Sequence, residues 1–95
     1  MNRAFVNEDA ASDPDPQYTL PERDSPHFDR AAALALIDGA DAGNTRSAET
    51  ATGYRFGEPC LVPHVEVLLQ EAIDIGDDRG EQLARRFLRK ALELA

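Results

Sequence analysis

Apolar side chains between residues 25 and 95 recur every three or four positions, and single glycines divide this pattern into segments. A spacing of three or four places apolar groups on one side of an α-helix, whereas a half-buried strand needs strict alternation. The glycines stand at the ends of the segments, where helices commonly stop in the left-handed conformation. The pattern therefore predicts an all-α domain of three to four helices packed as antiparallel helical hairpins.

The first two predicted helices differ in how many large apolar residues they carry. Ser25 can act as the N-cap with Pro26 at the first helical position, so we expect the first helix to run from there to the glycines of 39–43. Its alanines permit close helix packing, and a shorter helix is expected over 44–52. The aromatic segment 54–57 is predicted to be a connector that plugs the core. The expected apolar side of the first helix comprises Phe28, Ala31, Ala32, Leu34, Ala35, Leu36 and Ile37.

The last two predicted helices carry opposite charges on their polar faces. Glu58-Pro59 opens the third helix, in which Pro63 is tolerated only within the first turn. A turn at 76–78 leads to a helix from about Arg79. We expect an antiparallel hairpin in which the charges help to choose the partner face. The expected apolar residues are Leu61, Val65, Leu68, Leu69, Ala72, Ile73 and Ile75 on the third helix, and Leu83, Ala84, Phe87, Leu88, Ala91, Leu92 and Leu94 on the last.

Residues 1–24 differ in composition from the rest of the chain. Asp13-Pro14-Asp15-Pro16 and scattered acids leave too few large apolar groups to offset the entropy of ordering the backbone. We expect a disordered acidic N-terminal arm over 1–24 and a small helical domain over 25–95. The short apolar groups at 5–6 and 18–20 are either incidental or able to dock onto a partner or the domain.

The last predicted hairpin contains Gly76-Asp77, followed by Ala84, Phe87 and the segment 90–94. This pattern resembles the second half of a tetratricopeptide repeat, mainly over residues 65–94. A weaker trace at Gly43-Asn44, Ala48 and Pro59 lies about 33 to 36 residues upstream, near the period of that family. The large aromatic residue usual early in the first helix is missing, and two units are fewer than the usual three. The resemblance implies helical-hairpin architecture and peptide binding in a groove between helices.

The residues that could carry chemistry do not form a recognisable catalytic or metal-binding motif. Cys60 is the only cysteine, which excludes an intramolecular disulfide and fits a reducing compartment. An enzyme would need either Cys60 activated by His64 or a pair of carboxylates that the sequence does not single out. Neither His64 nor His27 completes a metal-binding face. We therefore expect no catalytic residues, no cofactor and no metal.

The charge balance and the absence of long apolar runs disfavour two classes of partner, nucleic acids and membranes. The chain has 18 acidic and 10 basic side chains, which disfavours bulk binding to nucleic acid. No run approaches the roughly 20 apolar residues of a membrane span, and the start lacks the pattern of an export signal. We expect a cytoplasmic protein without a membrane partner.

The sequence favours a small, non-catalytic protein–protein interaction module or oligomerising domain. Val67 lies off the main apolar face of its helix and indicates surplus apolar surface, so Val67→Asp should dissociate an oligomer. The alternative is a nucleic-acid-associated regulator that uses the basic last helix. The expected partner-binding residues are Arg85, Arg86, Arg89, Lys90 and Val67.

Overall fold

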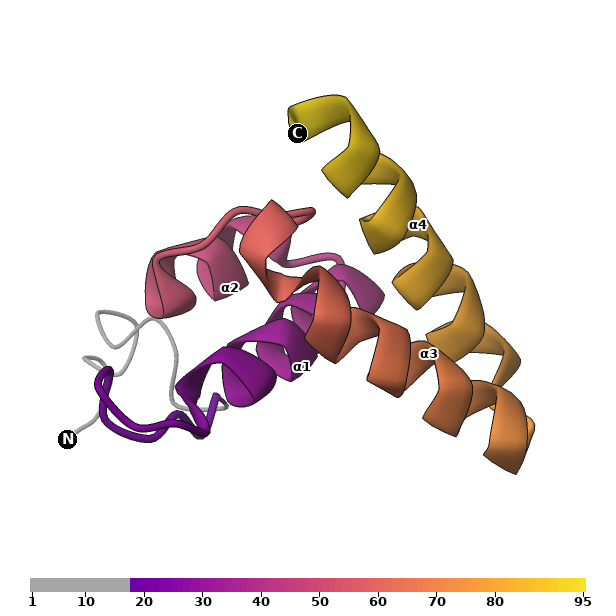
Figure 1. Cartoon of the computed structure of the whole chain (residues 1–95), viewed down its shortest axis with the longest axis horizontal. Helices are drawn as coiled ribbons and strands as arrows, with labels where there is room; N and C mark the ends of the chain where they lie inside the picture. The colour runs from indigo at the N-terminus through magenta and orange to yellow at the C-terminus, as the bar shows by residue number, and fades with distance from the viewer. Residues whose placement is uncertain (1–17) are drawn as a thin grey trace, which may run out of the picture.

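The computed structural model describes residues 18–95, which form an all-helical domain (Figure 1). Its helices are α1 (Phe28–Asp41), α2 (Thr45–Thr52), the 3-10 turn η2 (Pro59–Leu61), α3 (Val62–Ile75) and α4 (Asp78–Leu94). The all-α prediction is confirmed for this part of the chain. Two hairpins, α1–α2 and α3–α4, follow one another, and α1 contacts all three of the other α-helices.

Helix α1 begins later than the sequence predicted. The Ser25 hydroxyl accepts a hydrogen bond from the backbone N–H of His27 at 3.1 Å. The backbone N–H of Phe28 also donates to the Ser25 carbonyl at 3.1 Å, so residues 25–28 form a turn that leads into α1. The α-helix starts at Phe28, with His27 at the N-cap position. The prediction of Ser25 as the N-cap was therefore wrong, because its hydroxyl bonds within this preceding turn.

Small residues allow α1 and α2 to approach closely. Gly39 lies inside α1, and the helix ends before Gly43, whose φ of 72° is left-handed. A Cβ atom on Gly39 would lie 2.6 Å from the Cβ of Ala48 in α2. Gly39 thus serves the packing of the hairpin, and the sequence was wrong to give it a part in ending the helix.

The connector 54–57 packs against the core, as predicted, and lies between the two hairpins in the chain. Its Phe56 ring packs edge-on against Phe87 of α4, with the ring centroids 5.0 Å apart. The backbone N–H of Phe56 donates to the Glu49 carboxylate at 2.8 Å. Gly57 has a φ of 93° and lies directly beneath the stem of Lys90. The connector is held by both a core contact and a hydrogen bond to α2.

The turn between α3 and α4 is short and capped. Gly76 ends α3 with a φ of 75°, and the Asp77 side chain accepts from the backbone N–H of Gly80 at 2.9 Å. Pro63 is the second residue of α3, so it lies in the first turn as required. Within residues 18–95, however, no ion pair joins α3 to α4. Apolar packing therefore holds this hairpin, and the predicted charge pairing between its helices is absent.

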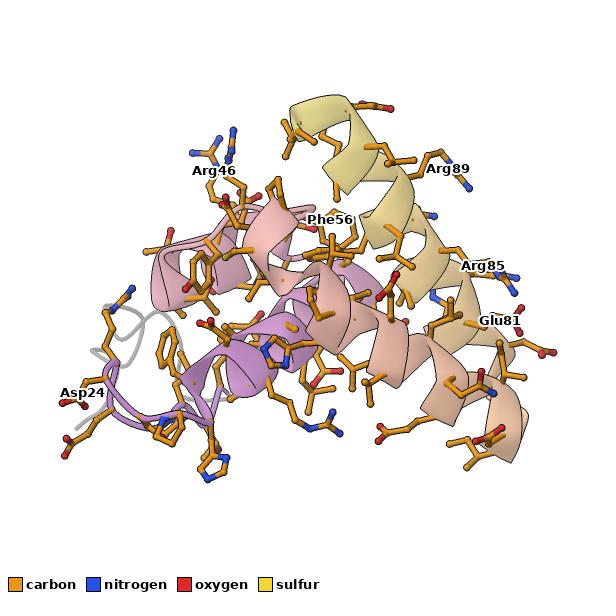
Figure 2. All side chains as sticks on the ribbon, viewed as in Figure 1. Asp24, Arg46, Phe56, Glu81, Arg85 and Arg89 are labelled. Carbon is orange, nitrogen blue, oxygen red and sulfur yellow. The ribbon has the colours of Figure 1, made fainter. Side chains whose placement is uncertain are left out.

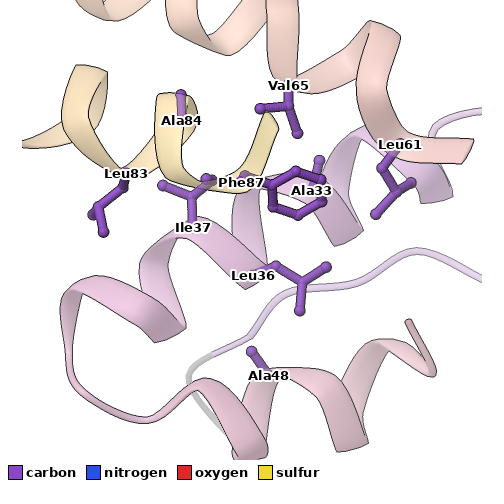
Figure 3. Close-up of a cluster of buried hydrophobic side chains, with 9 residues drawn as sticks. All are labelled: Ala33, Leu36, Ile37, Ala48, Leu61, Val65, Leu83, Ala84 and Phe87. Atoms are coloured by element: carbon purple, nitrogen blue, oxygen red, sulfur yellow. The ribbon is translucent and has the colours of Figure 1, made fainter. Parts of the chain in front are cut away.

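A single core gathers side chains from α1, α2, η2, α3 and α4 (Figure 3). Figure 3 shows the ring of Phe87 between Val65 and Leu36, and all three are fully buried. The remaining members are Ala33, Ile37, Ala48, Leu61, Leu83 and Ala84.

Several large apolar residues that periodicity assigned to the core are exposed. They are Leu34 of α1, Ile73 and Ile75 of α3, and Leu92 of α4. Ile75 is 77 % exposed and Leu92 is 80 % exposed, because each lies near an end of the long hairpin where no other helix covers it. Ala33, which the sequence pattern omitted, is fully buried.

Residues 18–24 pack against the helices, contrary to the predicted boundary at residue 25. The Arg23 guanidinium lies 4.9 Å from the centre of the Phe28 ring and donates to the backbone carbonyl of Thr52 at 3.1 Å. Tyr18 packs against the core cluster. The apolar pair at 5–6 lies outside the described residues.

The close contact between Gly39 and Ala48 predicts that Gly39→Ala destabilises the domain by about 1–3 kcal/mol, since overpacking outweighs the gain of about 1 kcal/mol in helix propensity. The free energy of unfolding from urea denaturation measures this. The control is the double variant Gly39→Ala/Ala48→Gly, which removes the clashing Cβ and should recover part of the loss. Strictly additive effects would contradict the proposed contact.

Candidate functional site

An apolar groove runs between the start of α3 and the second half of α4. Val62 and Leu88 are half-buried in its walls, and Leu92 stands exposed at its edge. Figure 1 shows the last turns of α4 extending beyond α2 and η2. The groove encloses about 360 Å³ and is lined by Pro59, Val62, Glu66, Leu88, Arg89, Ala91, Leu92 and Ala95. We refer to these residues as the apolar groove.

Two opposite charges line the apolar groove. Glu66 comes from α3 and Arg89 from α4, and both side chains are exposed. Neither forms an ion pair with any residue of the described segment 18–95. The groove therefore offers an apolar floor with one acidic and one basic group that remain available to a partner.

A second groove lies between α1 and the turned end of the α3–α4 hairpin. Its exposed apolar walls are Leu34 and Ile75, and it encloses about 250 Å³. We refer to it as the acidic groove because carboxylates outnumber cations in its lining. The lining comprises Leu34, Ile37, Asp38, Asp41, Leu68, Glu71, Ala72, Ile75, Asp77, Arg79, Gly80, Leu83 and Ala84.

Most of the carboxylates of the acidic groove already have partners. The Arg79 guanidinium contacts Asp41 at 2.8 Å, and Arg30 contacts Glu71 at 3.1 Å. Burial, and to a lesser extent the neighbouring Asp41 carboxylate, raises the pKa of Asp38. These ion pairs join α1 to the α3–α4 hairpin. The acidic groove is therefore an intramolecular contact between helices, whose charged groups are largely used within the domain.

The basic residues of α4 are all exposed but differ in their contacts. Figure 2 shows Arg85 and Arg89 extending away from the bundle, with Glu81 beside Arg85. Arg85 pairs with Glu81 at 3.0 Å, whereas Lys90 lies over Gly57 and contacts Glu93 at 3.6 Å. Arg86 is exposed and, like Arg89, has no ion pair within residues 18–95.

Val67 is exposed, as the sequence predicted, but lies apart from both grooves. Its side chain is 47 % exposed and belongs to the lining of neither one. The structure therefore does not bring Val67 together with Arg89, although the sequence grouped them as partner-binding residues. Its part in an interface stays a prediction.

Sequence reasoning missed the residues that make the apolar groove distinctive. It placed Leu92 in the core and Glu66 on an ordinary solvated face. Periodicity alone gave no signal for either residue, because it identifies the face of a helix and not how far the neighbouring helix covers that face.

Cys60 is a free cysteine whose surroundings do not activate its thiol. Cys60 is exposed as a residue, but neighbouring atoms still remove some water from its thiol. This desolvation raises the pKa of the Cys60 thiol, and the nearby Asp29 and Glu58 carboxylates raise it further. An activated thiol needs a lowered pKa. The neighbouring Tyr54 hydroxyl donates to Asp29 at 2.7 Å, and this bond is the largest cause that raises the pKa of Tyr54 to about 12.

The described residues contain neither a cluster of metal ligands nor a membrane-spanning helix. Within 18–95, no three His, Cys, Asp or Glu side chains lie close enough to hold a metal ion together. None of the helices in that range has the length and hydropathy needed to cross a bilayer.

The Tyr54–Asp29 bond predicts that Asp29→Asn lowers the pKa of Tyr54 from about 12 towards its ordinary 10.0. A raised folded-state pKa means that its contribution to stability is present below pH 10 and is lost as pH rises through about 12. Spectrophotometric titration of the phenolate in a Tyr18→Phe background isolates this group, and Glu71→Gln serves as the control. An unchanged Tyr54 titration in Asp29→Asn would contradict the assignment.

Comparisons of this chain with protein-family models, with curated proteins and with solved structures find no match. No activity, ligand or partner therefore transfers to it from another protein. Its function has to be inferred from its own grooves and charges.

Proposed function

We propose that the helical domain is a non-catalytic protein-interaction module whose docking surface is the apolar groove. The observation that carries this proposal is Leu92, which is 80 % exposed beside the half-buried Leu88 and Val62. Exposed apolar surface rimmed by polar groups is typical of protein–protein contact sites. A helix or peptide with apolar side chains at helical spacing would bury Leu92 and fill the groove.

The lining of the apolar groove favours a protein partner over a small metabolite. Small-molecule sites combine an apolar pocket with a few convergent polar groups. Here Glu66 and Arg89 are exposed, and the rest of the lining is aliphatic or proline. Such a surface has few polar groups that could orient a small polar molecule. An amphipathic helix or peptide can instead pack apolar side chains on the aliphatic lining and pair with Glu66 and Arg89.

The non-catalytic part of the proposal is supported by the titration of the candidate groups. A nucleophile or a general base at neutral pH needs a pKa near or below the working pH. The pKa of Cys60 is raised, and that of Tyr54 is about 12.

We also infer a cytoplasmic location, because the single cysteine suits a reducing compartment.

The resemblance to tetratricopeptide repeats is also part of this proposal. Helices α1 and α3 each have 14 residues and begin about 34 positions apart, near the period of that family. Each is ended by a left-handed glycine, and Asn44 or Asp77 then precedes the next helix. These parallels support a duplicated hairpin that binds peptides between helices.

The proposal predicts that Leu92→Asp abolishes a protein contact while leaving the domain folded. The wild-type chain and the variant are each immobilised and exposed to native lysate of the source cells, and the retained proteins are quantified. We expect retention of a specific protein to fall at least tenfold, about 1.4 kcal/mol or more, since a charge would enter the groove. Unfolding should change by less than about 0.5 kcal/mol, because the side chain is exposed.

Gln82→Asp is the matched control for that experiment, because Gln82 is exposed on the same helix, lines neither groove and gains the same negative charge. It should retain what the wild-type chain retains. Equal retention by wild type and Leu92→Asp would contradict a docking function for the apolar groove.

The second candidate is a nucleic-acid-associated regulator that uses α4. Its support is that Arg86 and Arg89 are exposed and lack ion pairs within residues 18–95. The formal net charge of −8 opposes it through long-range repulsion of phosphates.

This second candidate predicts binding to duplex or single-stranded nucleic acid that weakens steeply with salt. Arg86→Ala/Arg89→Ala should reduce the salt slope by about 2, one for each lost phosphate contact. Arg55→Ala is the control, because Arg55 lies outside α4 and pairs with Glu58. Fluorescence anisotropy without any binding at low salt would eliminate the candidate.

A further inference from the structure

We infer that the occupant of the apolar groove is a second copy of this chain, joined by a two-fold axis. This inference rests on the proposed docking function and names its partner. It depends on the composition of the groove, where the exposed Leu92 lies beside the half-buried Val62 and Leu88. The same groove is also lined by Glu66 and Arg89.

The exposed apolar side chain of the groove lies next to an apolar surface that could receive it from a second copy. Leu92 stands at the edge of the groove, while Val62 and Leu88 are half-buried in its walls. A two-fold interface uses the same patch on both copies, so a residue that contacts a second position is itself contacted by that position. Each copy can therefore place its Leu92 against the other's Val62 and Leu88, and both exposed leucines become buried.

The charges that line the apolar groove are complementary between two copies of the chain. Glu66 and Arg89 face the same groove from opposite helices, and neither has an ion pair within the part of the chain described here. A two-fold arrangement brings Arg89 of one copy towards Glu66 of the other, and the converse. A second copy supplies both countercharges at once, whereas a heterologous partner must match them independently.

Charge repulsion opposes association of two copies, and burial of apolar surface favours it. The formal net charge of −8 makes two copies repel at long range. At about 0.15 M salt the Debye length is about 8 Å, so most of this repulsion is screened while close contacts remain. Burial of the aliphatic lining supplies the affinity, and the two reciprocal ion pairs fix the register.

The test measures the molar mass of the full chain by sedimentation equilibrium over a range of concentrations. We expect wild type to dimerise and Leu92→Asp to weaken the dimer by about 100-fold or more. Glu66→Arg and Arg89→Glu should each weaken it by about tenfold or more, because like charges then face each other twice. Circular dichroism checks that the variants fold.

The decisive arm mixes the Glu66→Arg chain with the Arg89→Glu chain. In the mixed dimer each new arginine faces a new glutamate, and the native pair forms on the other side of the axis. Dimerisation should therefore return towards the wild-type constant in the mixture. Pairing within one copy cannot produce this recovery.

Two controls separate this interface from others. Arg46→Glu makes the same charge change on α2, outside both grooves, and should leave the dimer unchanged. Val67→Asp tests the competing interface that the sequence predicted, because Val67 lines neither groove, and a dimer built on the apolar groove should tolerate it. A dimer that Leu92→Asp leaves intact, or that Val67→Asp dissociates instead, would overturn the inference. Absence of recovery in the mixture would overturn it too.

A monomeric wild-type chain at every concentration would also overturn the inference, but it would leave the proposed docking function to be judged separately. That function would still be supported if Leu92→Asp lost a protein retained by the wild-type chain. If retention were equal, the docking function would fail as well.

Discussion

Close packing of small side chains along α1 is the interaction on which the rest of the domain depends. Ala32 and Ala33 are fully buried, and Gly39 leaves no room for a Cβ against α2. Larger side chains at these positions would push α2 and the second hairpin away from α1. Because α1 contacts each of the other α-helices, its narrow profile determines how the two hairpins meet.

The core built around α1 is small, so its few large side chains carry most of the apolar burial. Phe87 provides the centre, and Phe56 from the connector closes over it. A domain of this size buries a modest share of its surface, and Cys60 cannot form an intramolecular disulfide. Contacts outside the helices therefore matter, including the hydrogen bond from Phe56 to Glu49 and the placement of Arg23 over Phe28.

The two grooves lie where the helices of the bundle stop covering one another. The end of α4 extends beyond α2 and η2, and Leu92 on its last turns is left exposed (Figure 1). At the other end, the hairpin turn extends past α1 and exposes Ile75. Ion pairs with α1 bridge the seam at the turn, whereas Glu66 and Arg89 of the apolar groove lack such partners within 18–95.

The sequence by itself determined the all-helical class, the division at Gly53 and Gly76, and the amphipathic character of α4, because these follow from local spacing and backbone conformation. Only the tertiary structure decided which apolar residues are covered, since coverage depends on where another helix ends. The same reason explains Leu92 and Glu66: periodicity identifies a face of a helix, and the neighbouring elements determine how much of that face remains open.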